Sequence, residues 1–195
     1  MPPVTEENKE YSTQDWPEGW QNIDPFESYR SLFNGDLIAS NNPELIFTRG
    51  TNTGGENIST MVQHQMPFQM GGYNCHGISL KQCDAYYTNT GEDVLGKDDY
   101  LGRGDGSQRR TGFVTQDTEE QYKPLKEGVS LQYAEREPRF YASVAYNGSV
   151  WEMTTSYDDY NRFYRAWYYH DSSDGKVAQT GEPVSYTHLT LPTIA

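Results

Sequence analysis

The segment from Tyr133 to Met153, YAEREPRFYASVAYNGSVWEM, constrains the fold most, because it combines a regular apolar pattern with a turn signal. Over Phe140–Tyr146 the side chains alternate between two faces, which predicts a pleated strand with one buried face. Asn147-Gly148 follows and favours a type I′ turn, because both residue types tolerate a positive φ. We therefore predict a β-hairpin whose second strand runs over Ser149–Met153.

Two helix starts carry capping signals. The first, DPFE at Asp24–Glu27, offers an N-cap aspartate, a proline at the first helical position and a capping-box glutamate. Helical spacing then predicts an apolar stripe, made by Phe26, Tyr29, Leu32 and Phe33. The second helix is predicted to begin at Ser79 and to end by Asn89–Gly91. Its Cys83 is expected to be a small buried hydrophobe, and a Cys75–Cys83 disulfide is the alternative.

Between these elements the sequence has less regularity. Glu44–Arg49 is a candidate short strand, and Gln63–Gly77 is expected to be a loop packed by its own side chains. Glu92–Gly128 has little periodicity, and a loop of that length is usually functional or disordered. The aromatic run Tyr157–Tyr169 fits either a helix or a twisted strand.

Composition limits the classes of protein. The chain has 195 residues, 34% hydrophobic residues and a formal net charge of −13, which is near the boundary with disordered chains. Its aromatic content of 14% instead indicates a folded, loop-rich chain. An acidic chain without a Lys/Arg cluster is a poor binder of nucleic acid, and the sequence contains no apolar run long enough to span a membrane.

Catalytic and metal-binding patterns are weak. Glycoside hydrolysis needs two carboxylates across a sugar, and Glu135 with Glu137 or Asp158 with Asp159 could supply them. Such pairs arise by chance in a chain with 28 acidic residues. His64 and His76 have no partners at metal-ligand spacing. We expect no catalytic residue, no metal and no cofactor.

Carbohydrate binding has a clearer physical basis. Sugars present apolar C–H faces and hydroxyl groups, so their sites combine flat aromatic rings with polar side chains. Such combinations recur along this chain. The predicted ligand-binding residues are Trp16, Trp20, Tyr73, Asn74, Tyr100 and Trp151. The alternative for each aromatic residue is simple packing in the core.

Three segments in order resemble the SusD/RagB family, nutrient-binding lipoproteins on the outer membrane of Bacteroidetes-type bacteria. They are NPELIF at Asn42–Phe47, SLKQCDAYY at Ser79–Tyr87 and REPRFYASVAYNGSVW at Arg136–Trp151. The resemblance implies a mainly α fold, that is a SusD-like, TPR-type helical scaffold, with long irregular loops and a short β-hairpin.

The resemblance also implies a function. The protein would bind an oligosaccharide or similar nutrient on the extracellular face of the outer membrane. It would deliver the ligand to a TonB-dependent, SusC-like transporter, without nucleic acid or cofactor. Membrane contact would be through an N-terminal lipid anchor that is missing from this chain. A carbohydrate-active enzyme or its accessory module is the alternative, and a structural surface protein without a small ligand is a third hypothesis.

The resemblance further suggests where native sequence ends. Residues 1–183 are expected to be the middle part of a longer SusD/RagB-like protein. TGEP at Thr180–Pro183 still fits the family pattern, whereas residues 184–195, VSYTHLTLPTIA, depart from it. This tail resembles a translated sequencing adapter, and we expect it to be non-native.

Overall fold

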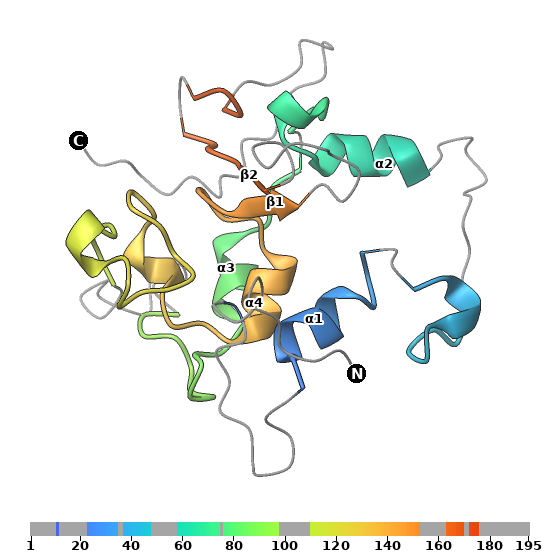
Figure 1. Cartoon of the computed structure of the whole chain (residues 1–195), viewed down its shortest axis with the longest axis horizontal. Helices are drawn as coiled ribbons and strands as arrows, with labels where there is room; N and C mark the ends of the chain where they lie inside the picture. Colours follow the sequence, from blue (N-terminus) through green and yellow to red (C-terminus); the bar gives the residue numbers. More distant parts are fainter. Residues whose placement is uncertain are drawn as a thin grey trace. The chain divides into compact units, whose positions relative to one another are not determined.

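The computed structural model describes residues 11, 23–34, 37–47, 58–74, 76–97, 110–152, 163–169 and 172–175. The chain divides into two compact units. Unit 1 comprises Met1–Thr48 and Leu80–Val144, and unit 2 comprises Arg49–Ser79 and Ala145–Ala195. Short helices and turns dominate the described part of both units (Figure 1).

In unit 1, helix α1 (Pro25–Arg30) begins where the DPFE signal predicts. The Asp24 side chain accepts a hydrogen bond from the Glu27 backbone N–H at 3.0 Å, and Pro25 occupies the first turn, where no N–H donor is needed. Phe26 is buried, but Phe33 is 67% exposed. The predicted start is therefore confirmed, while the apolar stripe does not extend to Phe33 because the helix ends before it.

Helix α3 (Leu80–Asp84) begins as predicted but ends earlier than Asn89–Gly91. Near its end the backbone carbonyls find a partner outside the helix. The carbonyl oxygens of Cys83 and Tyr86 accept hydrogen bonds from the guanidinium group of Arg136. The side chain of Cys83 is buried, as expected for a small hydrophobe. Cys75 lies outside the described residues.

The strand predicted over Phe140–Tyr146 is wrong. Helix α4 (Pro138–Ser143) occupies most of it, with Pro138 in the first turn, and it packs against α1 (Figure 1). Phe140, Tyr141 and Val144 are buried, and their spacing is that of one helix face. The apolar pattern fitted both periods, and the packing of this face decided between them.

The strand predicted over Glu44–Arg49 is also wrong for the residues that are described. Pro43 and Glu44 form a turn, and the chain from Leu45 to Phe47 has no regular structure. No strand pairs with this segment among the described residues. The side chains of Ile46 and Phe47 are 102% and 83% exposed.

The described parts of the predicted irregular stretch Glu92–Gly128, residues 92–97 and 110–128, have little regular structure, as expected, yet the second part contributes to a small core. Their one helical element is the 3₁₀ turn η4 (Gln116–Thr118). The Val114 N–H donates to the carbonyl of Val129 at 2.9 Å, and these two side chains are buried together with Leu125. A second 3₁₀ turn, η5 (Leu131–Tyr133), follows.

In unit 2, the predicted loop Gln63–Gly77 begins inside helix α2 (Ile58–Gln65) and continues through the 3₁₀ turn η2 (Phe68–Met70). The chain then folds back along the helix, because the N–H groups of Tyr73 and Asn74 donate to the carbonyls of Gln63 and Met66. Gly72 permits this reversal, since a Cβ atom there would lie 2.1 Å from the Met66 carbonyl oxygen. The helix was missed, but the packing of the loop on itself is confirmed.

The second predicted strand exists, with a different partner. Strand β1 (Val150–Glu152) pairs antiparallel with β2 (Phe163–Arg165), in a register that places Trp151 opposite Tyr164. Asn147-Gly148 forms a turn, but only Gly148 has a positive φ, so the turn is not type I′. The Gly148 N–H donates to the Ala166 carbonyl at 2.8 Å.

The described residues therefore contain four short α-helices, several 3₁₀ turns and one two-stranded sheet. Long irregular segments and a small antiparallel strand pair agree with the expected fold class. The TPR-type scaffold stays a prediction. So does the division between residues 1–183 and 184–195, because residues 176–195 lie outside the described residues.

Candidate functional site

Three of the predicted ligand-binding residues lie in the described part of unit 2: Tyr73, Asn74 and Trp151. The other three lie outside the described residues: Trp16, Trp20 and Tyr100. The site is therefore built from unit 2, where polar and aromatic side chains surround a buried carboxylate.

Asp174 supplies that carboxylate, and its side chain is fully buried. One carboxylate oxygen accepts from the backbone N–H of Gln69 at 3.1 Å. The other accepts from the Tyr164 hydroxyl at 2.5 Å and from the backbone N–H of Trp167 at 3.3 Å. The Asn74 side-chain amide donates to the backbone carbonyl of Asp174 at 2.8 Å. The carboxylate thus connects the segment after α2 with strand β2 and the residues that follow it.

We call Trp167, Tyr168 and Tyr169 the aromatic turn. The rings of Trp167 and Tyr169 meet edge to face, with centroids 6.1 Å apart and planes at 63°. The Ser172 hydroxyl lies within hydrogen-bonding distance of the carbonyl oxygens of both residues. Trp167 is half-buried and Tyr169 is 45% exposed. Two aromatic rings are thus held at a fixed angle and remain partly open to solvent.

Trp151 lies next to this turn in the hydrogen-bond network. Its indole N–H donates to the Tyr168 hydroxyl at 2.7 Å, and the Tyr168 backbone N–H donates to the Asn147 side chain at 2.7 Å. Burial raises the pKa of Tyr168 above its ordinary value of 10.0. The indole N–H of the half-buried Trp151 is therefore engaged within the protein.

Tyr73 has a different environment. Its ring lies beside His64 of α2, with centroids 5.3 Å apart, and His64 in turn meets His76 at 5.4 Å. Asn74 is hydrogen-bonded to Asp174, and Tyr164, the partner of Asp174, lies opposite Trp151 in the β1–β2 pair. Tyr73 instead packs against α2.

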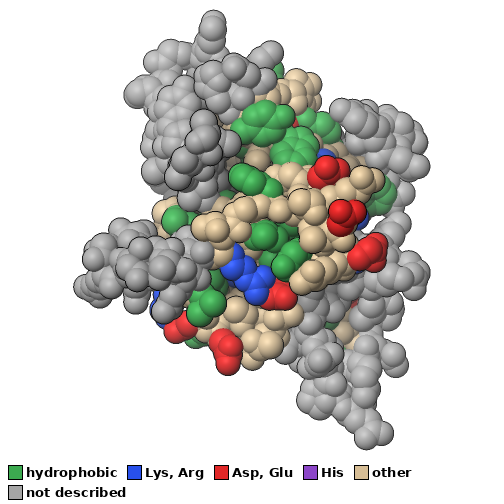
Figure 2. Space-filling view, turned by 90° about the vertical axis from the view of Figure 1, so that its left-hand side faces the viewer, with side chains coloured by type: hydrophobic (Ala, Val, Ile, Leu, Met, Phe, Trp, Pro, Cys, Tyr) green, Lys and Arg blue, Asp and Glu red, His purple; other side chains and the backbone are tan. Residues whose placement is uncertain are grey.

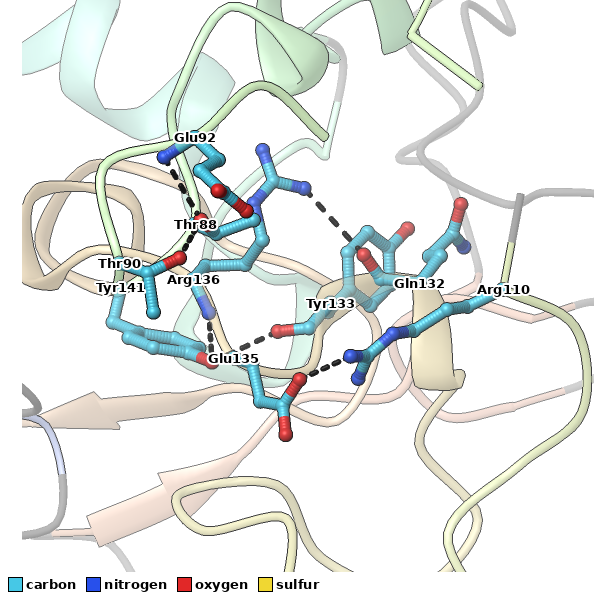
Figure 3. A network of polar contacts seen from close by, with 9 residues as sticks. All are labelled: Thr88, Thr90, Glu92, Arg110, Gln132, Tyr133, Glu135, Arg136 and Tyr141. Atoms are coloured by element: carbon cyan, nitrogen blue, oxygen red, sulfur yellow. Dashed lines mark hydrogen bonds and ion pairs between the residues drawn. The ribbon is translucent and has the colours of Figure 1, made fainter. Parts of the chain in front are cut away.

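Unit 1 contains the second polar network, which is centred on Arg136 (Figure 3). The Arg136 side chain is buried. Its guanidinium group donates to the backbone carbonyls of Cys83, Tyr86 and Gln132, the last two at 3.0 and 3.4 Å. It also lies 4.3 Å from the centroid of the Phe140 ring. Burial lowers its pKa, and the nearby Asp84 acts in the opposite direction.

Tyr141 completes this network. Its hydroxyl accepts from the Arg136 backbone N–H at 3.2 Å and donates to the Tyr133 carbonyl at 2.9 Å. Burial raises its pKa above the ordinary value of 10.0. Because the guanidinium group and this hydroxyl bind the backbone in the interior, the network stabilises unit 1 and presents no surface for a ligand.

The carboxylates considered for catalysis serve other contacts. Glu135 forms an ion pair with Arg110 (Figure 3). Glu137 accepts from the Tyr87 N–H at 2.9 Å and pairs with Arg139 at 2.6 Å. Asp158 and Asp159 lie outside the described residues. The geometry gives no support to Glu135 and Glu137 as a hydrolytic pair.

The part of the chain that the structure describes holds no group of three or more His, Cys, Asp or Glu side chains placed to bind a metal ion. No helix in that part is long and apolar enough to cross a membrane. On the face drawn in Figure 2, hydrophobic side chains form several patches, and the basic side chains have acidic neighbours.

Sequence reasoning missed Asp174 and Tyr169 and left the structure around Trp167 open. Asp174 carries no motif. Its only local signal is the short Ser-Ser-Asp-Gly sequence, which begins three residues after the last tyrosine of an aromatic run and is typical of a turn.

Comparison with known protein families shows to which family the chain belongs. The family model described as the SusD family matches residues 43–187, which is more than half of the 195 residues. The chain belongs to the SusD family. The match includes the Arg136 network and all the residues around Asp174. Comparisons with curated proteins and with solved structures gave no match.

Membership of the SusD family gives the function in general terms. Members bind glycans or other nutrients at the cell surface, and they are binding proteins rather than enzymes. They are typically outer-membrane lipoproteins and are associated with SusC-like transporters. For this SusD-family chain the resemblance noted in the sequence is thereby confirmed.

Proposed function

We propose that this SusD-family protein captures an oligosaccharide with the aromatic turn and Trp151 of unit 2. The observation that carries the proposal is the pair of rings of Trp167 and Tyr169, which are partly exposed and fixed edge to face. Sugar rings stack their C–H faces on such surfaces, and affinity depends on flat aromatic area held in place before binding.

The polar contacts support the same proposal. A sugar hydroxyl needs donors and acceptors around the aromatic surface, and Asn147, Tyr168 and Ser173 lie close to the rings in sequence or in the network. The Ser173 side chain is exposed, and its hydroxyl, which lies 3.5 Å from that of Tyr164, can also bind a sugar hydroxyl. No covalent step is required, and moderate affinity suits a protein that must release its ligand.

The experiment is calorimetric titration of the full chain with maltohexaose, cellohexaose, xylohexaose and mannohexaose. We expect at least one to bind, and Trp167→Ala to weaken that binding about tenfold, because a central tryptophan often contributes most of the contact energy. Phe113→Ala is the matched control, since Phe113 is a 56% exposed aromatic residue of unit 1. Equal affinities for both variants and the unchanged chain would place the site elsewhere.

We further propose that the complete protein is anchored to the extracellular face of the outer membrane and delivers its ligand to a TonB-dependent, SusC-like transporter. The family relationship supports this proposal. The DNA on both sides of the coding region tests it. A lipoprotein signal upstream and an adjacent transporter gene are expected, and a frame flanked by neither would contradict the proposal.

A further inference from the structure

Asp174 lies at the meeting point of segments that are far apart in the sequence. Its contacts with Gln69 and Asn74 span 105 and 100 residues, respectively. Its contacts with Tyr164 and Trp167 are local. One buried side chain therefore holds the segment after α2 against the strand and turn that carry the aromatic rings.

The three groups that donate to the carboxylate are all neutral: two backbone N–H groups and one hydroxyl. Burying a carboxylate is costly unless it is hydrogen-bonded, and here both of its oxygens accept hydrogen bonds. What the carboxylate adds is direction, because each donor must point at a particular oxygen. This indicates that the position of the donors, rather than stability alone, is what Asp174 supplies.

The surrounding backbone leaves little freedom. A Cβ atom at Gly175 would lie 2.2 Å from the carbonyl oxygen of Tyr169, and the Gly175 N–H donates to the Ser172 hydroxyl at 3.0 Å. Trp167 is thus fixed at its N–H by Asp174, and its carbonyl is fixed by Ser172. These contacts set the backbone from which both partly exposed rings project.

We infer that Asp174 is a positioning residue for glycan binding, which sets the angle of the Trp167 and Tyr169 rings and orders the Gln69–Asn74 segment beside them. The inference rests on the proposed function, because it assigns a role in the proposed site. The carboxylate itself is buried and does not contact the ligand.

The test uses the full chain and the hexasaccharide that binds best in the titrations above. Asp174→Ala removes all three acceptor contacts, and we expect binding at least about tenfold weaker. Asp174→Asn keeps one acceptor oxygen and is expected to be intermediate. Tyr164→Phe removes only the hydroxyl and should have the smallest effect. Asp117→Ala, which removes an exposed carboxylate of unit 1, is the control.

Each affinity is measured at a temperature where far-ultraviolet circular dichroism shows the variant to be fully folded. Near-ultraviolet circular dichroism then reports the packing of the aromatic rings without ligand. We expect the affinities and the near-ultraviolet signal to fall in the same order, with Asp174→Ala lowest. If the variants only melt at lower temperatures, and their folded forms bind with unchanged affinity, Asp174 is merely structural and the inference is overturned.

Failure of the proposed function gives a different result. The unchanged chain and Asp117→Ala would then bind none of the four hexasaccharides. The near-ultraviolet comparison still decides the role of Asp174 in that case. A changed spectrum in Asp174→Ala, and not in Asp117→Ala, would support ring positioning. Identical spectra would overturn it.

Discussion

Both units bury a charged side chain, and they do so with opposite polarity. In unit 1 the cation Arg136 donates to backbone carbonyl oxygens. In unit 2 the anion Asp174 accepts from backbone N–H groups and a tyrosine hydroxyl. Each charge is therefore stabilised largely by hydrogen bonds with backbone C=O or N–H groups. Such contacts fix the backbone in a chain whose described helices and strands are short.

The difference lies in what each network supports. The aromatic neighbours of Arg136, including Phe140 and Tyr141, are buried. Asp174 instead accepts from the backbone N–H of Trp167, whose ring meets that of Tyr169, and both rings are partly exposed. The first network is architectural, whereas the second ends at a surface suited to binding. Loss of the first should therefore reduce stability, and loss of the second should reduce affinity.

The largest expected effect is that of Arg136→Ala. Three backbone carbonyls lose a donor and a cavity opens beside Phe140, so we expect the free energy of unfolding to fall by about 3–5 kcal/mol. Urea unfolding followed by circular dichroism measures this loss. Arg110→Ala is the control, because Arg110 and its ion-pair partner Glu135 are both partly exposed, and such a surface pair is worth about 0–1 kcal/mol. Similar losses in the two variants would contradict the architectural role of Arg136.

Alkaline pH should destabilise both units through their buried tyrosines. Burial raises the pKa of Tyr141 and Tyr168 above 10.0 in the folded chain. Their stabilising effect is therefore complete below pH 10 and is lost as the pH rises beyond it, because the unfolded chain ionises first. Each group contributes up to about 1.4 kcal/mol per pH unit. Thermal unfolding between pH 8 and 11 measures the decline.

Phenylalanine variants sharpen this test unit by unit. Tyr141→Phe and Tyr168→Phe should each flatten the decline above pH 10, because each removes one ionisable group. A decline in either variant as steep as that of the unchanged chain would show that the tyrosine in question is not responsible.

The smallest expected effect is that of Asp24→Ala in unit 1. Asp24 is buried like Asp174, and its side chain accepts an N-cap hydrogen bond from the backbone N–H of Glu27, three residues away. Loss of such a cap costs about 1 kcal/mol, and urea unfolding again measures it. Glycan affinity should stay unchanged, in contrast to Asp174→Ala. Asp93→Ala serves as control, since Asp93 is an exposed partner of Lys97. A fall in affinity for Asp24→Ala would remove the distinction between the two carboxylates.

The sequence predicted the features that depend on neighbouring residues. The start of α1 follows from the Asp24 cap, which acts within one turn, and α3 begins directly after Ser79, as the local sequence predicts. The turn at Asn147-Gly148 was also found. In these cases the residues that form the contact are the residues that form the motif.

Features that depend on distant residues were not predictable in the same way. Phe140–Tyr146 carries apolar residues at both strand and helix spacing, and only packing against α1 selects the helix. Strand β1 pairs with β2 and not with the adjacent segment. Asp174 and its partner Gln69 are 105 residues apart, so no local pattern in a single sequence could reveal their contact.

That separation has a consequence for biosynthesis. A chain that emerges from the ribosome N-terminus first can complete the Arg136 network once residues up to Val144 are available. The segment around Gln69 must wait for Asp174, about one hundred residues later. Unit 1 is thus ready to form while the proposed glycan-binding surface of unit 2 is still incomplete. That surface would be among the last parts of the described chain to form.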